Sequence, residues 1–381
     1  MADYNGLAKD LHLKYRGKIT TALRDTRQLN YDELSAYYTP GVGHISALVA
    51  ENPALLADYS WTGNLVAVVS DGSAVLGLGD IGAAGAMPVM EGKALLFKYF
   101  ADLDSVPIVL DVHEPDEIVA TVKAIAPSFG AINLEDIAAP KCFEIENRLK
   151  AELNIPVMHD DQHGTAVVVL AGLINAAQVT GRDLNDTRVV LSGVGAAGTA
   201  IARLLKRYAP GAHIIGVAKE GMLHRDYRSL SEPKRRLLTE GLLADDGAGS
   251  LSDAMVGSDI FIGVSAPGIV TAPMVRSMAH DSLIFALSNP VPEIYPDEAA
   301  AAGAAVICTG RSDFPNQVNN ALVFPGIFRG ALDHRVSQIS DEHKLAAAVK
   351  LASLVPKPTV NEVIPSIFLP NLSAEVASVI V

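Results

Sequence analysis

The chain has 381 residues, of which 49% are hydrophobic and 19% charged, and its formal net charge is −13. This length allows two domains with a substantial core, and the negative charge argues against nucleic acid or an anionic membrane as a partner. A small anionic substrate is not excluded, because a binding site can be locally positive.

Cysteine use and apolar stretches indicate neither secretion nor membrane insertion. Cys142 and Cys308 are far apart in sequence and fit neither a disulfide framework nor a metal-binding spacing, so we interpret them as buried free thiols. The N-terminus lacks an apolar signal core, and the most apolar stretch, near residues 166–177, is too short to span a membrane. We therefore expect a cytoplasmic protein.

The first part of the chain alternates between predicted helices and strands. Residues 1–60 are predicted to be mostly helical, with a turn at residues 38–43, and residues 72–92 to form a glycine-rich loop held close to another segment. The strand candidates are 65–70, 106–112, 130–134 and 156–159. The helix candidates beside them are 91–102, 116–126, 141–154 and 165–180. This alternation predicts an α/β unit with a parallel sheet.

A glycine motif opens the second part of the chain. Gly193-Val-Gly-Ala-Ala-Gly198 follows the apolar strand candidate 188–192 and leads into a predicted helix over 196–208. Strand, G-x-G-x-x-G and helix together form the dinucleotide-binding fingerprint. In this motif Gly193 permits a tight turn, Gly195 lets the pyrophosphate approach the backbone, and Gly198 allows the helix to pack closely on the strand. The N-terminus of the helix attracts the phosphates. A glycine-rich turn in an unrelated α/β protein is the alternative, which the flanking elements disfavour.

A second alternation completes the predicted fold. Its strand candidates are 188–192, 213–218, 259–264, 283–287 and 305–309. They predict a Rossmann-type sheet, with a surface excursion over 219–250 and a closing helix and returning tail over 341–381. The fold class is therefore α/β, with an N-terminal substrate and metal domain over 1–162 and a dinucleotide-binding domain over 163–381. The active-site cleft is expected near residues 135–165.

Acidic residues follow two successive strands of the first unit. Glu135 and Asp136 come after strand 130–134, and Asp160 and Asp161 come after strand 156–159. Ligands of open parallel sheets bind at the carboxyl ends of the strands, where these carboxylates would repel one another without a cation between them. An all-oxygen set favours Mg²⁺ or Mn²⁺. The alternative is that Asp160 or Asp161 caps the following helix while Glu135 and Asp136 face water.

Histidines also flank this predicted site. His159 and His163 have the spacing of a zinc pair on a helix. Because His159 should end a strand and His163 should begin a helix, the two would not share a face, and we do not assign zinc.

Several further residues are candidates whose roles their spacing alone leaves open. Tyr38 lies in the turn near the N-terminus, and Lys93 follows the glycine-rich stretch at the expected start of a helix. A lysine there usually faces solvent, but beside a metal in a closed cleft its pKa would fall and it could act as a base. Asn289, Asn319 and Asn320 lie in turns where asparagines are mostly structural, although near a nicotinamide they could hold a carboxamide or carboxylate.

Taken together, these segments resemble the malic enzyme family in its short bacterial form. The matching segments are YYTPGVG (37–43), VLGLGDIG (75–82), PVMEGKALLFK (88–98), INLEDI (132–137), HDDQHGTAVV (159–168), SGVGAAG (192–198), FALSNP (285–290) and NNALVFPGIF (319–328). The resemblance covers nearly the whole chain.

The resemblance implies roles for individual residues. It places a tyrosine general acid at Tyr38 and a lysine base at Lys93, with a neighbouring site aspartate at Asp160. The implied metal carboxylates are Glu135, Asp136 and Asp161. The positions implied for the dinucleotide are Gly193, Gly195, Ala196, Ala197, Gly198, Ala218, Lys219 and Asn289, and those implied for the substrate are Asn289, Asn319 and Asn320.

Two positions depart from the family pattern. Ala74 stands where longer members carry an arginine for the substrate carboxylate, so another group must hold it. Ala218 stands where an acid would contact the adenosine ribose, with Lys219 and Glu220 following. Without that acid, repulsion of the NADP⁺ phosphate is removed, and we expect NADP⁺ to be accepted with a slight lean over NAD⁺.

The implied reaction is the oxidative decarboxylation of malate to pyruvate through oxaloacetate. It would use NAD⁺ or NADP⁺ and a divalent cation, and the resemblance implies a homodimer. One alternative is a metal-dependent oxaloacetate decarboxylase without the redox step, which the intact glycines disfavour. A non-enzymatic ligand-binding protein is a second alternative, disfavoured by the intact Tyr38, Lys93 and carboxylates.

Overall fold

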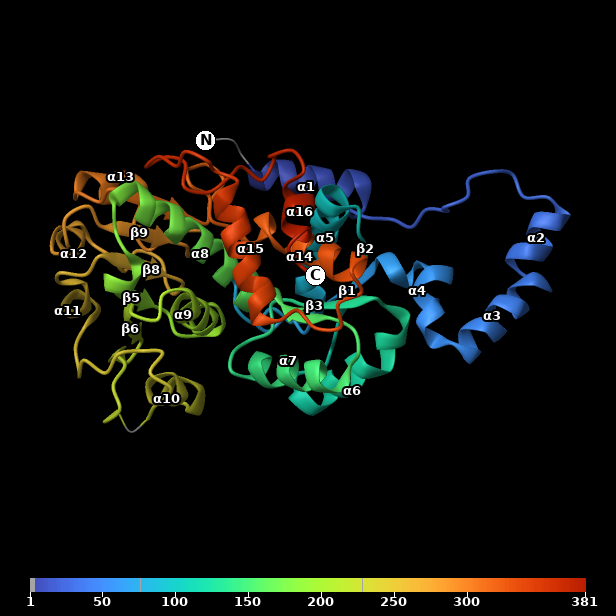
Figure 1. Cartoon of the computed structure of the whole chain (residues 1–381), viewed down its shortest axis with the longest axis horizontal. Helices are drawn as coiled ribbons and strands as arrows, with labels where there is room; N and C mark the ends of the chain where they lie inside the picture. The colour runs from blue at the N-terminus through green and yellow to red at the C-terminus, as the bar shows by residue number, and fades with distance from the viewer. Residues whose placement is uncertain (1–3, 76, 228) are drawn as a thin grey trace.

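The computed structural model describes residues 4–75, 77–227 and 229–381, and it has two β-sheets covered by helices (Figure 1). The strands are β1 (Leu65–Ser70), β2 (Asp104–Val109), β3 (Ala131–Leu134), β4 (Val157–His159), β5 (Arg188–Ser192), β6 (His213–Ala218), β7 (Gly221–Met222), β8 (Ile260–Gly263), β9 (Leu283–Ala286) and β10 (Val306–Thr309).

The α-helices lie before, between and after these strands. They are α1 (Tyr4–Tyr15), α2 (Tyr31–Tyr37), α3 (Gly41–Glu51), α4 (Leu56–Tyr59), α5 (Gly82–Ala101), α6 (Pro115–Ile125), α7 (Lys141–Glu152), α8 (Asp160–Thr180), α9 (Ala196–Tyr208), α10 (Glu232–Thr239), α11 (Leu251–Met255), α12 (Ala272–Arg276), α13 (Pro296–Ala301), α14 (Phe324–Asp333), α15 (Asp341–Ser353) and α16 (Leu372–Ala377). Short 3₁₀ helices are η1 (Pro53–Leu55), η2 (Trp61–Asn64), η3 (Ala126–Ser128), η4 (Leu184–Asp186) and η5 (Asn320–Leu322).

The first sheet is parallel and has the strand order β2-β1-β3-β4. Its inner strands β1 and β3 are buried along their whole length, which explains why their sequences are continuously apolar instead of alternating. The strands come from the predicted segments, although β2 begins and ends earlier than the predicted 106–112. Because all four run in one direction, their carboxyl ends share one edge of the sheet.

Two helices of this half begin earlier than predicted. The helix expected over 91–102 is α5, which begins at Gly82, so only the first part of the predicted 72–92 loop is a loop. Residue 76 in that loop lies outside the described residues. The helix expected over 165–180 is α8, which begins at Asp160. Small residues and glycines hid both helix starts, since glycine is read as a breaker when packing around it is unknown.

The second sheet has the order β10-β9-β8-β5-β6-β7 and carries the predicted Rossmann-type strands. All neighbours are parallel except β6 and β7, which form a small antiparallel pair at one edge. The predicted surface excursion over 219–250 includes β7 and α10, and it buries Leu237 and Leu238, so it is more ordered than expected. The tail returns as predicted, with α16 packing on α14 and α5 of the first half.

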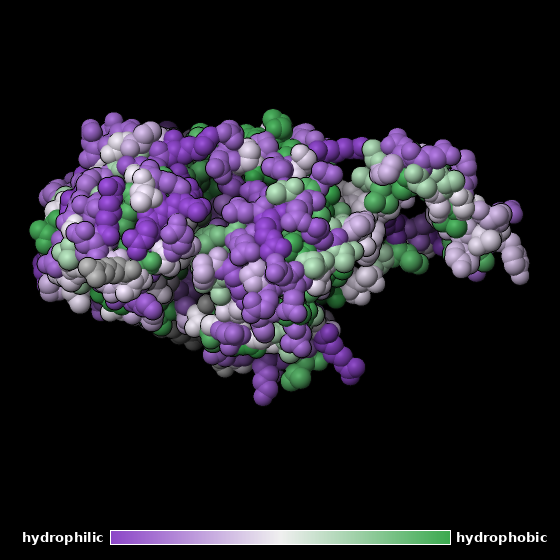
Figure 2. All heavy atoms as spheres, turned by 90° about the horizontal axis from the view of Figure 1, so that it is seen from below, coloured by the Kyte–Doolittle hydropathy of each residue, from purple (hydrophilic) through white to green (hydrophobic). Residues whose placement is uncertain are grey.

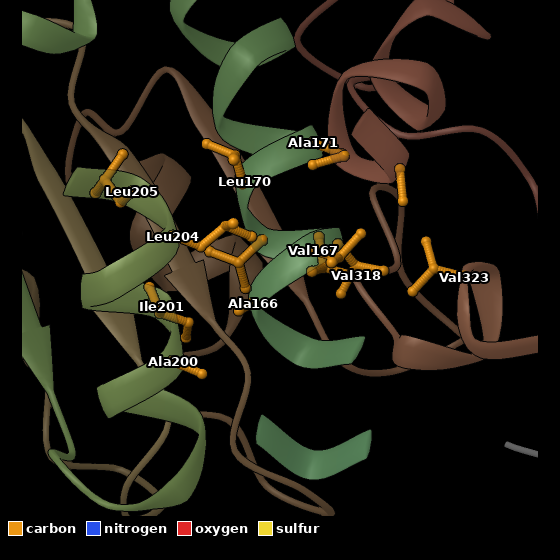
Figure 3. Close-up of a cluster of buried hydrophobic side chains, with 14 of the residues drawn as sticks. Ala166, Val167, Leu170, Ala171, Ala200, Ile201, Leu204, Leu205, Val318 and Val323 are labelled. Carbon is orange, nitrogen blue, oxygen red and sulfur yellow. The ribbon is translucent and has the colours of Figure 1, made fainter. Parts of the chain in front are cut away.

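Helix α8 joins the two halves. It packs against α9 and α15, and Figure 3 shows Ala166 of α8 beside Leu204 of α9, whereas Val167 lies on the other side of α8 next to Val318. By length and composition α8 could cross a membrane, contrary to the expected short apolar stretch, but 67% of its apolar window is buried inside the protein. Its apolarity is explained by this core position. The predicted domain boundary after residue 162 falls in its first turn and stays a prediction.

An N-terminal arm, residues 25–52, projects away from the sheets (Figure 1). No described residue of α2 or α3 in this arm is buried. The preceding segment is tied to the body through Lys18, which donates to the Pro88 carbonyl at 2.6 Å, and through the Arg24–Asp104 ion pair at 2.8 Å. Tyr31 and Leu34 are among the apolar side chains of the arm that face solvent. Figure 2 shows hydrophobic surface, in green, on the projecting arm. Such short helices are marginal without a packing partner.

The α8–α9 contact should dominate the stability of the second half. Replacing Leu170, which is 1% exposed, by alanine removes buried methyl groups and leaves a cavity, at a cost of about 2–5 kcal/mol in the free energy of unfolding. Urea unfolding followed by circular dichroism measures this loss. The control Val349→Ala, at a position on α15 that is 45% exposed, should change stability by less than about 0.5 kcal/mol. Equal effects of the two substitutions would contradict this assignment of the core.

Candidate active site

Three carboxylates gather at the carboxyl edge of the first sheet. Glu135 and Asp136 follow β3, while Asp161 lies in the first turn of α8 directly after β4. One oxygen from each lies within 4.8 Å of the other two. Asp136 has φ of 52°, and its backbone N–H donates to Asp161 Oδ2 at 2.8 Å, which orients the two residues toward each other.

Burial of these groups rules out the capping alternative. Glu135 is 4% and Asp136 is 5% exposed, so neither faces water as that alternative required. Helix α8 begins at Asp160 with His159 at its N-cap position and no side-chain cap, so neither aspartate caps a helix near residue 165. Hard divalent cations prefer such a set of carboxylate oxygens, and the donor geometry fits a shared cation.

Lys93 projects from the middle of α5 into this acidic edge. Its Nζ lies 2.7 Å from Asp160 Oδ2 and 2.9 Å from Glu135 Oε1, and the lysine is almost fully buried. The same Nζ lies 4.2 Å from the centre of the Phe324 ring, which covers it on another side. The lysine therefore does not face solvent, and its place inside a long helix differs from the helix start that we expected.

Burial and neighbouring charges shift the pKa values of Lys93 and of the carboxylates around it. Burial alone would lower the pKa of Lys93, but Asp160, Glu135 and Asp161 outweigh it and raise that pKa above its ordinary value. In the protein without a cation, the carboxylates therefore stabilise the ammonium ion, and the fall in the pKa of Lys93 expected beside a metal stays a prediction. Burial raises the pKa of Glu135 to about 7 and that of Asp160 to about 6, although Lys93 opposes both shifts. Among the described residues, Asp160 Oδ1 is buried without a hydrogen-bond partner.

The two histidines near the carboxylates contact different acids. His159 Nε2 is 3.6 Å from Asp161 Oδ2, whereas His163 Nε2 is 2.9 Å from Glu146 Oε2, so the two rings serve different partners and do not form a zinc pair. The sequence reasoning missed Glu146, which is 3% exposed and also accepts the His159 backbone N–H at 3.1 Å. A lone glutamate in an amphipathic helix gives no sequence signal, because only the packing of α7 on β4 buries it.

The glycine motif has the geometry that the fingerprint requires. Gly193 has φ of 98°, and a Cβ added there would lie 2.5 Å from the Val264 carbonyl. A Cβ on Gly198 would lie 1.9 Å from the Gly193 carbonyl, so only glycine fits this close packing. Around Gly195, by contrast, a Cβ would meet no described atom within 4 Å. This open space lies at the uncapped start of α9, beside Ala196 and Ala197, and it fits an approaching pyrophosphate.

The predicted ribose-contacting position lies at the end of β6. Ala218 is the last residue of that strand, and Lys219 follows it. Glu220, the nearest acid, is paired with Lys234, whose Nζ donates to its two oxygens at 3.0 and 3.1 Å. Lys234 was not foreseen from the sequence, since it lies on α10 beyond a long connection. The pairing offsets the negative charge that would otherwise oppose a ribose phosphate.

The asparagines differ in their surroundings. Asn289 lies between two glycines: a Cβ on Gly77 would be 2.5 Å from its carbonyl, and a Cβ on Gly310 would be 2.6 Å from its Nδ2. The side chain of Asn319 accepts the Ala321 N–H at 2.9 Å and so caps η5. Asn320 lies close to the beginning of α8. A Cβ added to Gly164 of that helix would be 3.0 Å from the Cβ of Asn320. Asn320 is thus near Asp160, while the oxygen of Asn319 already has a structural partner.

Tyr38 is the predicted site residue that the chain does not bring to the cluster. It directly follows α2, which lies in the projecting arm (Figure 1). Its exposed fraction is 69%. Lys93, in contrast, is enclosed in the body of the protein. One chain therefore assembles the carboxylates and the lysine but leaves the tyrosine outside.

Comparisons with protein families cover most of the chain. The family model described as "Malic enzyme, N-terminal domain" matches residues 17–115 and 112–150, and the model described as "Malic enzyme, NAD binding domain" matches residues 162–381.

Individual relatives agree with these matches. The chain is 55% identical to an NAD-dependent malic enzyme of Geobacillus stearothermophilus over 88% of this chain and 70% of that protein. It is 48% identical to a bifunctional malic/malolactic enzyme of Bacillus subtilis over 98% and 91% of the two chains. Its fold matches the crystal structure of an NAD-dependent malic enzyme from Thermotoga maritima with a TM-score of 0.93 and 44% identity, over 98% of each chain.

The glycine turn gives a matched pair of substitutions. Gly195→Ala points a methyl group into the open space, so we expect normal folding but at least about tenfold weaker NADH binding. Gly198→Ala forces a methyl group against the Gly193 carbonyl, so we expect a loss of about 1–3 kcal/mol or more in stability. NADH fluorescence titration and thermal unfolding measure the two effects. Unchanged NADH affinity in Gly195→Ala would show that the phosphates do not approach there.

Proposed function

The chain belongs to the malic enzyme family, and we propose that its NAD(P)-dependent oxidative decarboxylation of malate uses Mg²⁺ or Mn²⁺ held by Glu135, Asp136 and Asp161. The observation that carries this proposal is the buried bridge from Lys93 to Asp160 and Glu135, directly beside the three-carboxylate set. When bound, such a cation would polarise the reacting oxygen of the substrate and stabilise the negative charge that develops as CO₂ leaves. The bound nicotinamide would accept the hydride.

The chain's own groups would manage the protons. Lys93 accepts the proton of the malate hydroxyl once the negative charge around its Nζ has been offset, since the surrounding carboxylates otherwise keep the ammonium protonated. Loss of CO₂ from oxaloacetate leaves an enol, whose carbon must gain a proton to give pyruvate. Tyr38 would supply that proton, as a phenol can act as a general acid. Asn289 and Asn320 would orient the substrate or the carboxamide, a role that the position of Asn320 beside Gly164 and Asp160 supports for that residue.

From the exposed position of Tyr38 we infer that a second copy of the chain completes the site. The projecting arm exposes apolar residues and buries none in α2 or α3, which is typical of a segment that packs on a partner. A homodimer in which each arm reaches across would deliver Tyr38 to the Lys93 of the other copy. The protein would then have two composite sites. We also propose a cytoplasmic location for this dimer.

The redox-free decarboxylase alternative has no support in the structure. The NAD-binding model matches residues 162–381, and Gly193, Gly195 and Gly198 retain the geometry of a dinucleotide turn. The ligand-binding alternative is likewise not retained, because the carboxylates and Lys93 come together as a reactive cluster. The following experiments test the cation, the composite site and the choice of dinucleotide.

The first experiment tests the cation. Because binding requires ionised carboxylates, Mn²⁺ affinity should rise as the pH rises through about 7, the pKa of Glu135. Asp161→Asn should weaken Mn²⁺ binding by more than about tenfold, the loss that even outer partners of metal ligands cause. Isothermal titration with Mn²⁺ measures both effects, with the exposed Asp116→Asn as control. Full malate turnover by Asp161→Asn at low Mn²⁺ would sink the assignment.

The second experiment tests whether Tyr38 acts across the dimer. Tyr38→Phe and Lys93→Ala should each be nearly inactive, but a re-equilibrated equal mixture should regain about a quarter of wild-type activity, because half of the dimers are hybrids with one intact site. Malate-dependent NAD(P)H formation measures the recovery. If mixing restores nothing while gel filtration shows that hybrids form, Tyr38 does not serve the partner's Lys93.

The third experiment tests the dinucleotide. Ala218→Asp places a carboxylate where it repels the extra phosphate of NADP⁺, so the ratio of kcat/KM values should shift toward NAD⁺ by about tenfold. Lys234→Met, which releases Glu220, should shift the ratio in the same direction. Wild-type protein should turn over NADP⁺ slightly better than NAD⁺. A ratio unchanged in both variants would show that this connection does not contact the ribose.

A further inference from the structure

A basic cavity lies between α8, α9 and α15, outside the candidate active site. Its volume is about 320 Å³, and its lining includes Arg203, Lys206 and Arg207 of α9 and Lys344 of α15, against one carboxylate, Asp341. Arg203 and Arg207 also pair with Glu240 and Glu342, which lie outside the lining. The lining itself therefore carries more cations than carboxylates, although the net charge of the chain is −13.

The floor of the cavity is apolar. Ala166 of α8 and Ala200 and Leu204 of α9 line it, and Figure 3 shows these side chains between the two helices. Small side chains at two of these positions keep the helices from filling the space themselves. The result is a cationic rim above a short apolar surface, which suits a small carbon skeleton with charged ends.

The cationic side chains that line the cavity differ in their burial and in their hydrogen-bond or ion-pair partners. Lys344 is 3% exposed and pairs with Asp341 at 3.0 Å, while the side chain of Asp341 itself is 60% exposed. Burial lowers the pKa of Lys344, so the ammonium has lost much of its hydration. Arg203 and Arg207 lean outward to Glu240 and Glu342. Lys206 Nζ donates a hydrogen bond to the Pro210 carbonyl at 3.1 Å. Among the described residues, it has no other hydrogen-bond partner.

We propose that this cavity binds a small organic dianion, a short carbon skeleton carrying a phosphate or two carboxylates. The anion would pair with Lys344 and Lys206 and lay its carbon atoms on Leu204. Bringing it next to a buried ammonium restores the interaction that Lys344 lost with water. The lining begins at Ala200, beyond the first turn of α9 where the dinucleotide phosphates are expected, so the two sites differ.

A chain of contacts links the cavity to the acidic edge. His163 lines the cavity, and its Nε2 is 2.9 Å from Glu146, which also accepts the backbone N–H of His159 at 3.1 Å. Asp161 lies two residues before His163 in the same helix and thus on nearly the opposite face of α8. An anion beside His163 and Lys344 would alter the charge around Glu146 and, through it, the turn that carries Asp161. This coupling rests on the proposed metal site, whereas anion binding does not.

Isothermal titration of the full-length protein with inorganic phosphate or with succinate tests the binding, at constant ionic strength set with NaCl. The double variant Arg203→Gln/Lys206→Gln should bind the favoured probe at least tenfold more weakly than wild type, and Lys344→Met should lose more. The matched control Lys123→Gln/Arg148→Gln removes one exposed and one half-exposed cation elsewhere and should bind as wild type does. A preference for phosphate or for succinate identifies the charged group of the ligand.

Three outcomes would overturn the proposal. The first is no heat above the NaCl control with either probe. The second is unchanged affinity in Arg203→Gln/Lys206→Gln. The third is loss of probe binding in Asp161→Asn together with retention in the double variant, which would place the probe at the active site instead. If the probe binds as expected but Mn²⁺ affinity is the same with and without it, the coupling is wrong, because linkage between two sites is reciprocal.

Discussion

The structure depends on a buried ammonium that holds several carboxylates together. Glu135, Asp160 and Asp161 come to one sheet edge from two successive strands, and burial alone makes their charged forms costly. Lys93 offsets part of this cost at 2.7 and 2.9 Å. The compensation is incomplete, since the carboxylates remain harder to ionise than in water. An incompletely neutralised oxygen cluster is the kind of set that a divalent cation prefers, so the proposed cation would relieve the remaining cost of burying these charges.

This constraint explains how the elements around the site are arranged. Parallel strands bring the acids to a common edge, and α5 must cross that edge to deliver Lys93 from its middle rather than from its end. Helix α8 carries Asp160 and Asp161 at its start and then runs into the core between α9 and α15. One helix therefore belongs to the reactive edge and to the packing of the second sheet. A displacement of α9 or α15 would therefore move α8 and, with it, Asp160 and Asp161.

The N-terminal arm holds the part of the proposed site that a single chain does not bring to the carboxylates. Its helices have no core of their own, and Tyr38 lies on it in an exposed position. The remaining parts of the proposed site are buried inside the body. A site completed between two copies would tie catalysis to association, since a separated chain would keep the carboxylates and Lys93 but lack the tyrosine. The apolar residues of the arm would supply the free energy for that association.

The sequence by itself determined those features that depend on neighbours along the chain. The strand–glycine–helix unit at 188–208 was predicted to the residue, because its motif is local: a Cβ at Gly198 would meet the carbonyl of Gly193 five residues earlier. The parallel order of β3 and β4 predicted that Glu135 and Asp136 would meet Asp160 and Asp161 at one edge, whereas the family resemblance implied which three of them form the set. Only the tertiary structure decided the starts of α5 and α8, the bridge from Lys93, the burial of Glu146 and the distance of Tyr38 from the cluster. These depend on which surfaces are covered by segments remote in sequence, and periodicity along a chain does not specify such contacts.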